Sequence, residues 1–510
     1  MKLLKSILLA SGGLVMFAAV AHAADLPTKK APVAAPPPNC FATFMTWLDS
    51  TAGDCPLSFG PLTAYGQIDV GGSYQTNGAK FNPYYTNGVQ SVINKQANGA
   101  KWLWSPNNLS QSNLGLKLKQ KVFGDVNLIG DINFGFDPYS LQFANGPASL
   151  YDNNKVLPYY QTSNADSSRA GGIDNSRAYL GFASATYGTL TAGRQNTLSN
   201  SLASAYDPNG GAYAFSLIGY SSSVVNGTGD TETARYNTSI QYVYDYQKLV
   251  HVGAIVQLGG YNQQNGANGA YQIDVGGNYA GFSLDAIYSY AKDAVALSAY
   301  GGNGAGGYGL PKGVATYDLK ATLADINAGA LMLKYQWQQL SLYGGYVYEN
   351  FSNPSDSYSW GISNTVGGYA VLPSGITNTA YTINKVQQIV WVGAKYAVRP
   401  DLDVSAGFYD LWQNNYSGGV CVANTVTVTG APKGATTPQG DNTTANNKAG
   451  KTSNNCSGNE PVVSALIDWR PWKRVDTYAG VTWSEVTGGI AAGYIKNSNT
   501  ALTAGVRVSF

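Results

Sequence analysis

The sequence predicts an all-β fold, a 16-stranded antiparallel transmembrane β-barrel with short periplasmic turns and long extracellular loops. Three observations point to this fold class. Apolar and polar residues alternate with a period of two over segments of about ten residues, as in membrane-barrel strands. The connections between these segments are alternately very short and long, and the long ones are rich in Gly, Asn and Ser. Tyr and Trp gather near segment ends, where interfacial girdles place amphipathic rings, although core packing of a large soluble β protein also accounts for them.

The alternation is clearest in the segment 126–137. Leu128 and Ile132 lie on its apolar face, while Asp131 and Asn133 lie on the opposite face. An even number of such strands is required to close an antiparallel barrel with both chain ends in the periplasm. The sixteen predicted strands are 62–74, 111–120, 126–137, 176–185, 188–195, 234–244, 249–260, 269–279, 282–292, 327–337, 340–350, 386–397, 402–413, 461–469, 475–485 and 499–510.

Seven short turns and eight longer loops connect these strands. The predicted short turns are 121–125, 186–188, 246–248, 280–281, 338–339, 398–401 and 470–474. The stretch 316–324 also alternates, but an additional strand would break the up-and-down count, so we predict that it belongs to a loop. The last strand ends the chain at Phe510, and a C-terminal aromatic residue of this kind is typical of outer-membrane barrels.

The composition excludes two other classes of protein. Charged residues make up 12% of the 510 residues, against roughly 25% in soluble domains, which argues against an ordinary cytosolic enzyme. The mean hydropathy is −0.16, and only one stretch, at the N-terminus, approaches the about 20 apolar residues that a membrane helix needs. A bundle of membrane helices is therefore excluded as well.

Residues 1–23 form a predicted secretory signal peptide. Lys2 and Lys5 precede a short apolar region, and an A-x-A site predicts cleavage after Ala23, the alternative being an uncleaved N-terminal anchor. Removing these two lysines from the 31 basic residues leaves 29 against 29 acidic residues, so no charge excess suggests nucleic acid as a partner. The segment 24–61, which is Pro-rich and bounded by cysteines, is expected to lie in the periplasm.

Four cysteines predict two disulfides, because an even number in an exported chain favours pairing. Three connectivities are possible, and loop-closure entropy favours Cys40 with Cys55 and Cys421 with Cys456. Zinc binding is a weaker alternative, since no C-x-x-C motif occurs and His251 is the only histidine after the predicted signal. We therefore expect no metal site and no cofactor.

Four segments carry more specific sequence: 187–195 (YGTLTAGRQ), 207–211 (DPNGG), 235–242 (RYNTSIQY) and the cysteine-bounded 39–56. They resemble Gram-negative general porins, and are most similar to the alphaproteobacterial porin family. The first three resemble the fifth strand, the tip of the long third loop and the sixth strand of that family, although the acid here precedes the proline at the tip. The resemblance covers residues 62–510, the barrel, in architecture.

In that family the third loop folds into the barrel and narrows it, and acidic loop residues face basic wall residues. The resemblance implies that 196–233 is this constriction loop and that Asp207, Asp230 and Glu232 are its acidic residues. The alternative for each of the three is an ordinary solvated loop residue.

Four basic residues lie on the polar faces of their predicted strands. They are Lys117, Lys119, Arg177 and Arg235. All four are expected to point into the lumen, because a cation on the lipid face costs about 2–4 kcal/mol near the membrane midplane. Strict alternation turns Arg194 outward, so either a bulge reverses the register there or the residue lies above the bilayer. The resemblance favours the lumen for Arg194.

The expected function is passive diffusion of small hydrophilic solutes and ions through a water-filled pore. Opposed charges across a narrow slot would orient dipolar solutes and set the ion preference. The alternative is a substrate-selective channel for a sugar, an acid or a phosphate, for which Tyr343, Tyr409 and Tyr478 offer lumen-facing aromatic rings. A barrel enzyme is not expected, because His251 has no nucleophile beside it on its strand face. The long loop at 421–456 also suggests a surface receptor or adhesin.

Location and assembly follow mainly from the resemblance. It implies a homotrimer in the outer membrane of a Gram-negative bacterium, in contact with lipid and lipopolysaccharide. Outward-facing Gly66, Gly72 and Gly130 are compatible with close approach of neighbouring barrels and equally with lipid contact. Lys29 and Lys30 suggest contact with peptidoglycan on the periplasmic side.

Overall fold

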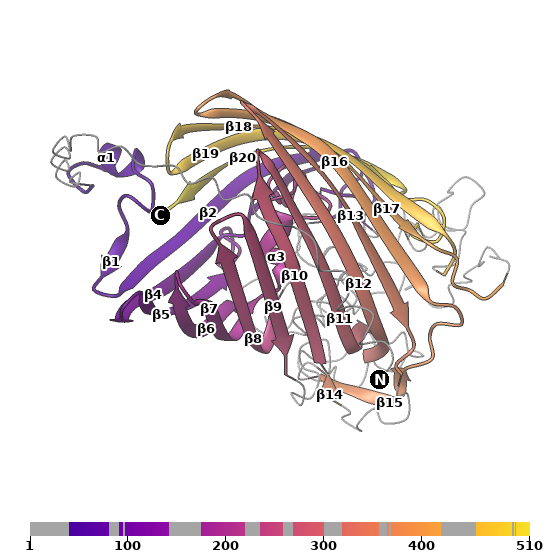
Figure 1. Ribbon diagram of the computed structural model, residues 1–510. Helices are drawn as coiled ribbons and strands as arrows, with labels where there is room; N and C mark the ends of the chain where they lie inside the picture. The colour runs from indigo at the N-terminus through magenta and orange to yellow at the C-terminus, as the bar shows by residue number, and fades with distance from the viewer. Residues whose placement is uncertain are drawn as a thin grey trace.

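The computed structural model describes residues 40–80, 91–94, 97–141, 175–219, 235–258, 269–299, 319–355, 365–366, 369–419, 455–491, 494 and 496–510. Tilted antiparallel strands form a closed barrel (Figure 1). Its wall consists of β2 Leu62–Gln75, β4 Asn113–Phe123, β5 Val126–Gly135, β6 Asn175–Ser184, β7 Gly188–Asn196, β8 Arg235–Tyr246, β9 Val250–Gln257, β10 Gly269–Tyr279, β11 Phe282–Ala299, β12 Leu319–Trp337, β13 Leu340–Ser352, β16 Lys385–Arg399, β17 Leu402–Gln413, β18 Gly458–Trp472, β19 Val475–Glu485 and β20 Ser498–Ser509.

The described residues also form four shorter strands and two short helices. They are the strands β1 Leu57–Phe59, β3 Lys101–Trp104, β14 Thr365–Val366 and β15 Tyr369–Thr377, and the helices α1 Phe44–Leu48 and α3 Leu198–Ala203. Neither helix of the described ranges has the length and apolar character needed to cross a membrane.

The prediction of a 16-stranded antiparallel barrel is confirmed, and each predicted strand corresponds to one wall strand. The prediction for 316–324 was wrong in part, because β12 begins at Leu319. Residues Leu319 to Ala324 extend β12 and pair with the extended end of β11, beyond a register shift after Ala291. Two neighbouring strands lengthen together here, so the barrel gains height and the strand count stays even.

The barrel closes through β2, which pairs with the wall strands β20 and β4 and with the short strands β3 and β1. Gln67–Gln75 pairs with β20 on one edge. On the other edge, Leu62–Gln67 pairs with β4, and Gly72–Gln75 pairs with β3. The C-terminal Phe510 exchanges two backbone hydrogen bonds with Gly66, of 3.0 and 2.9 Å. The first and last wall strands are therefore sealed to each other without a free edge.

The seven predicted short turns all join consecutive wall strands. The tightest joins β10 to β11 through Ala280 and Gly281, which have φ values of 49° and 85°. Two consecutive positive φ values define the hairpin turn whose twist matches antiparallel strands, and a glycine supplies the second at little cost. The short turns lie at the barrel end that also carries the C-terminus (Figure 1).

Alternation separates the two faces of the wall. In β5, Asp131 and Asn133 are buried, whereas Ile132 and Phe134 between and beside them are exposed. The same outward band of large apolar side chains runs over other strands, including Leu114, Leu116, Leu180, Phe182, Leu190, Ile240, Val275, Leu284, Leu333, Val392, Phe408, Val463 and Leu502. Apolar side chains face outward and polar ones inward, the reverse of a soluble protein and the pattern of a barrel in lipid.

The cysteine-bounded segment docks beside the barrel at the end that carries the short turns (Figure 1). Cys40 and Cys55 form the predicted disulfide. Arg474, which is 2% exposed, donates hydrogen bonds of 2.9 Å to the carbonyl oxygens of Trp47 and Cys55, and its guanidinium lies over the Trp47 ring. Cys456 is also disulfide-bonded, and its predicted partner Cys421 lies outside the described residues.

Candidate pore constriction

Residues 197–219, here called the inner loop, enter the barrel after β7. The loop begins with the short helix α3, whose N-cap Thr197 accepts a hydrogen bond from the backbone of Asn200. Ser199 and Gln272 of β10 exchange two hydrogen bonds of 3.1 and 3.0 Å. Helix α3 thus lies against the inner face of β9 and β10 (Figure 1).

The loop then follows the inner wall from β11 to β17. The Tyr206 hydroxyl donates to a carboxylate oxygen of Asp285 in β11, and the Tyr206 carbonyl accepts from the indole of Trp391 in β16 at 2.9 Å. The hydroxyl of Tyr409 in β17 donates to Asp207 at 2.5 Å. These contacts join consecutive parts of the loop to successive parts of the wall.

The end of the described loop continues along the same wall. Asn209 accepts from Ser405 of β17 at 2.8 Å and donates to Ser464 of β18 at 2.9 Å. The Ala214 carbonyl accepts from Thr482 of β19 at 2.7 Å. A Cβ at Gly480 would collide with Phe215, so the glycine lets the loop sit directly on the wall. The inner loop is therefore fastened to the wall from β9 to β19.

A different stretch of wall carries the predicted basic residues. Tyr65, Lys117, Asp131 and Arg177, here called the cationic wall, project from β2, β4, β5 and β6. Arg177 forms an ion pair of 3.1 Å with Asp131 and donates to the Tyr65 hydroxyl at 3.0 Å. The Lys117 ammonium lies 4.4 Å from the centre of the Tyr65 ring. The hydrogen bonds of the inner loop described above end on β10, β11 and β16 to β19, away from these four residues.

Six charged residues that we did not predict form a second set, here called the paired network. Lys395 and Arg470 bind Asp403 at 3.2 and 3.0 Å, and Arg470 also binds Asp468 at 2.9 Å. Arg507 binds Asp476 at 2.8 Å. Four of the six residues line a small cavity of about 120 Å³ together with Pro208 and Asn209 of the inner loop, namely Lys395, Asp403, Asp468 and Arg507. Charges on the inward positions of adjacent strands were the signal available in the sequence.

His251 of β9 also has partners that the sequence did not reveal. Its Nε2 contacts a carboxylate oxygen of Asp285 in β11 and lies 3.5 Å from Asp274 Oδ2 in β10. We call these three residues the histidine cluster. They come from three adjacent strands, so no spacing along the chain predicts them.

Asp207 is buried against the wall. It lies in the inner loop, as predicted, but it is 1% exposed, and its carboxylate accepts from Tyr409 and from the backbone of Gly211. Burial raises the pKa of the Asp207 carboxyl to about 6. The residue holds the loop to the wall. Asp230 and Glu232 lie outside the described residues.

Arg194 and Arg235 lie beside a bulge. Arg194 is half-buried opposite Ala178, and the pairing of β7 with β8 shifts register between Gly193 and Gln195. The shift breaks strict alternation along β8, so the face of Arg235 does not follow from that of residues further along the strand. Lumen-facing positions for both arginines stay predictions. Lys119 is exposed on β4, and its lumen-facing position likewise stays a prediction.

The tyrosines that suggested a selective channel are engaged elsewhere. Tyr409 and Tyr478 are 0% and 2% exposed, and the Tyr478 hydroxyl donates to Asp69 at 2.5 Å. Tyr343 lies near Lys334, whose ammonium is 5.4 Å from the ring centre. Two of the three rings are therefore inaccessible to a passing solute.

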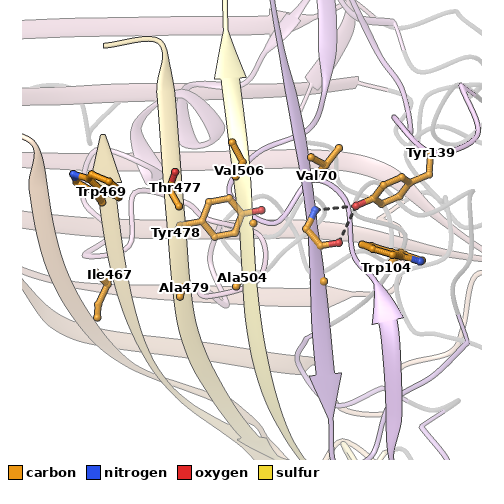
Figure 2. Close-up of a pocket in the computed structure, with 13 residues that line it drawn as sticks. Val70, Trp104, Tyr139, Ile467, Trp469, Thr477, Tyr478, Ala479, Ala504 and Val506 are labelled. Carbon is orange, nitrogen blue, oxygen red and sulfur yellow. Dashed lines mark hydrogen bonds between the residues drawn. The ribbon is translucent and has the colours of Figure 1, made fainter. Parts of the chain in front are cut away.

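An apolar groove of about 690 Å³ marks the outer surface where the barrel closes. Figure 2 shows Trp104 and Tyr139 on one side and Ile467 and Trp469 on the other. The floor consists of small residues of β2, β19 and β20, namely Gly71, Gly72, Ala479, Ala504 and Gly505. The Tyr139 hydroxyl donates to the Gly71 carbonyl at 2.8 Å, at the point where β2 exchanges one partner strand for another.

A closed barrel with an apolar exterior, a charged interior and a loop fastened along part of its inner wall defines an outer-membrane diffusion channel. The sequence agrees with this class. The chain belongs to the Gram-negative porin family, whose sequence pattern matches residues 10–366. It is a non-enzymatic channel of the outer membrane. The sequence has no significant match among curated proteins.

Solved porin structures show the same fold at low sequence identity. An anion-selective porin from Comamonas acidovorans superposes with a TM-score of 0.53 at 12% identity, over 88% of this chain and 99% of that one. In-vitro folded OmpT of Vibrio cholerae gives a TM-score of 0.50 at 13% identity, over 89% and 100%. A trimer form of OmpT gives 0.48 at 13% identity, over 88% and 99%.

Proposed function

We propose that solutes cross this general porin between the inner loop and the cationic wall, and that this passage sets the ion preference and the size limit. One observation supports the proposal most strongly. The described inner loop is hydrogen-bonded along the wall from β10 to β19, while Lys117 and Arg177 lie on the stretch formed by β4 and β6. A loop fastened to one side of a lumen leaves water on the other side.

The charges of this passage would produce a transverse field. Lys117, Lys119 and Arg177 would provide its positive side, together with Arg194 and Arg235. We assign the negative side to Asp230 and Glu232 of the constriction loop 196–233. Fixed charges in a narrow aqueous slot favour counter-ions and orient dipolar solutes.

Ion selectivity in a planar bilayer tests this proposal. Replacing Lys117 and Arg177 together by Gln should shift the reversal potential toward cation preference. Lys473→Gln, in the turn between β18 and β19, is the matched control and should leave it unchanged. The pair of changes Asp230→Asn and Glu232→Gln should shift it toward anions.

Two results would contradict the proposal. An unchanged reversal potential in the Lys117 and Arg177 variant would place the narrow zone elsewhere. A current that one sugar, acid or phosphate blocks saturably would favour the alternative, a substrate-selective channel.

We further propose that the porin assembles as a homotrimer through the outer groove. A floor of glycine and alanine between tryptophan rims fits close approach of a second barrel wall. A Cβ at Gly72 would lie 3.6 Å from its nearest neighbour, so a side chain fits the fold at this position. Gly72→Phe should therefore preserve the barrel but weaken the trimer, whereas Val275→Phe on lipid-facing β10 should not. Equal trimer content in both variants, measured by native electrophoresis, would exclude the groove.

The remaining proposals concern the chain ends and the membrane environment. We propose cleavage after Ala23, a periplasmic segment 24–61 and a second disulfide between Cys421 and Cys456. We also propose contact with lipopolysaccharide on the outer side of the membrane and with peptidoglycan on the periplasmic side. The cysteine-bounded segment supports a relationship to alphaproteobacterial porins. Deleting residues 29–38 should reduce co-sedimentation with peptidoglycan, and unchanged sedimentation would remove that contact.

A further inference from the structure

We propose that the histidine cluster binds a divalent transition-metal cation, with Zn²⁺ as the defining probe. His251, Asp274 and Asp285 each offer one ligand atom, and these atoms lie within 4.8 Å of one another. One imidazole nitrogen and two carboxylate oxygens form a donor set that suits Zn²⁺, whereas Ca²⁺ and Mg²⁺ prefer oxygen alone. The site is separate from the proposed solute passage.

The backbone of β10 makes room for the cluster. Gly276 stands between His251 and Asp285, because it pairs with His251 on one side and with Asp285 on the other. A Cβ at Gly276 would collide with the Asp285 carboxylate and with His251 Nε2. The glycine therefore leaves a cradle in which side chains from β9 and β11 meet across β10. Asp274 lies two residues away on the same face of β10.

The two carboxylates are buried with little compensation. Asp274 and Asp285 side chains are 3% and 1% exposed, and Asp274 Oδ1 has no hydrogen-bond partner among the described residues. His251 is their only ion-pair partner in the described ranges. The residue that pairs with His251 from β8 is Asp245, another acid. Burying two carboxylates this way is costly unless a cation or protons neutralise them.

The inner loop adds an outer contact to this site. Tyr206 donates its hydroxyl proton to the Asp285 oxygen that does not face His251. Hydrogen bonds of this kind orient carboxylate ligands in metal sites. The cation would therefore tie β9, β10 and β11 together directly, and would reinforce the attachment of the inner loop through Tyr206.

Zn²⁺ binding can be measured without any reference to conductance. Untagged protein purified from outer membranes is stripped with a chelator and dialysed against Zn²⁺, and bound metal is counted by mass spectrometry. We expect one Zn²⁺ per chain. His251→Gln and Asp274→Asn should each lower the affinity at least about tenfold. Asp410→Asn, a carboxylate of β17 that contacts Asn459, is the matched control and should bind like the wild type.

A second measurement requires no variant. His251 is the only histidine after the predicted signal peptide, so ¹⁵N-histidine labelling reports one imidazole. One equivalent of Zn²⁺ should displace its nitrogen resonances, and a chelator should restore them. The proposal is overturned if these resonances do not respond, if no metal binds, or if the two cluster variants bind as the control does. Any of these results leaves the proposed solute passage unaffected.

Discussion

Two groups of buried carboxylates on the inner wall of the barrel differ in their partners. On β16 to β20, the paired network places Lys395, Arg470 or Arg507 within 3.2 Å of an aspartate. On β9 to β11, Asp274 and Asp285 share one histidine and no lysine or arginine among the described residues. The three cations and three aspartates of the paired network balance one another, whereas Asp274 and Asp285 have only His251 as an ion-pair partner among the described residues. The same kind of side chain is therefore structural on one wall and a potential ligand on the other.

Breaking the paired network should have the largest effect. Arg507→Ala leaves Asp476 without its partner, and an uncompensated buried charge costs about 3–5 kcal/mol. We expect the free energy of unfolding in denaturant to fall by this order. The double variant Arg507→Met with Asp476→Leu should recover much of the free energy lost in Arg507→Ala, because no unpaired charge is then left. Equal losses in the single and double variants would mean that packing, not charge, is lost.

The free energy of unfolding should depend on pH through Asp207, the residue that attaches the inner loop to Tyr409 of the wall. Its folded pKa of about 6 lies above the usual 3.8, so the folded protein holds the proton more tightly. This contribution is complete below about pH 4 and is lost as pH rises through 6, for a total of about 3 kcal/mol. Asp207→Asn should remove this part of the pH dependence of unfolding. A variant with the wild-type slope between pH 4 and 7 would assign that slope to other groups.

The smallest effect is expected on the second wall, and with the opposite sign. Asp274→Asn removes one of two like charges, so in the presence of a chelator it should leave stability unchanged or raise it by up to about 1 kcal/mol. Asp403→Asn in the paired network should instead destabilise, because it leaves Lys395 and Arg470 without their shared partner. Thermal unfolding of the two variants side by side measures this contrast. A loss of stability in both variants would mean that the two groups of carboxylates do not differ in their contribution to stability.

Much of the fold was predictable because strand alternation is local. Asp131 faces inward and Ile132 outward for reasons contained in a few neighbouring residues. The extension of β12 was missed because only pairing with the lengthened β11 makes it a strand. The face of Arg235 was not readable either, since the bulge between β7 and β8 interrupts the period of two.

The residues of the candidate site also fall into those that local alternation predicts and those that only distant contacts define. Alternation alone places Lys117 and Arg177 on the polar faces of their strands, and the ion pair of Arg177 with Asp131 agrees with this. The lining of the pore by these two cations stays a prediction. The burial of Asp207 was not predicted, because its partner Tyr409 lies 202 residues away. The histidine cluster was missed for the same reason, since His251 and Asp285 meet only through the register of three strands.

The sequence by itself determined the number of strands, the faces of most of them, the short turns and the class of protein. These properties depend on backbone pleat, turn chemistry and the cost of polar groups in lipid, all of which act over a few residues. Only the tertiary structure decided which wall the inner loop covers, which acids are buried and which charges meet. Those properties depend on strand register and loop attachment, which bring together residues that are distant along the chain.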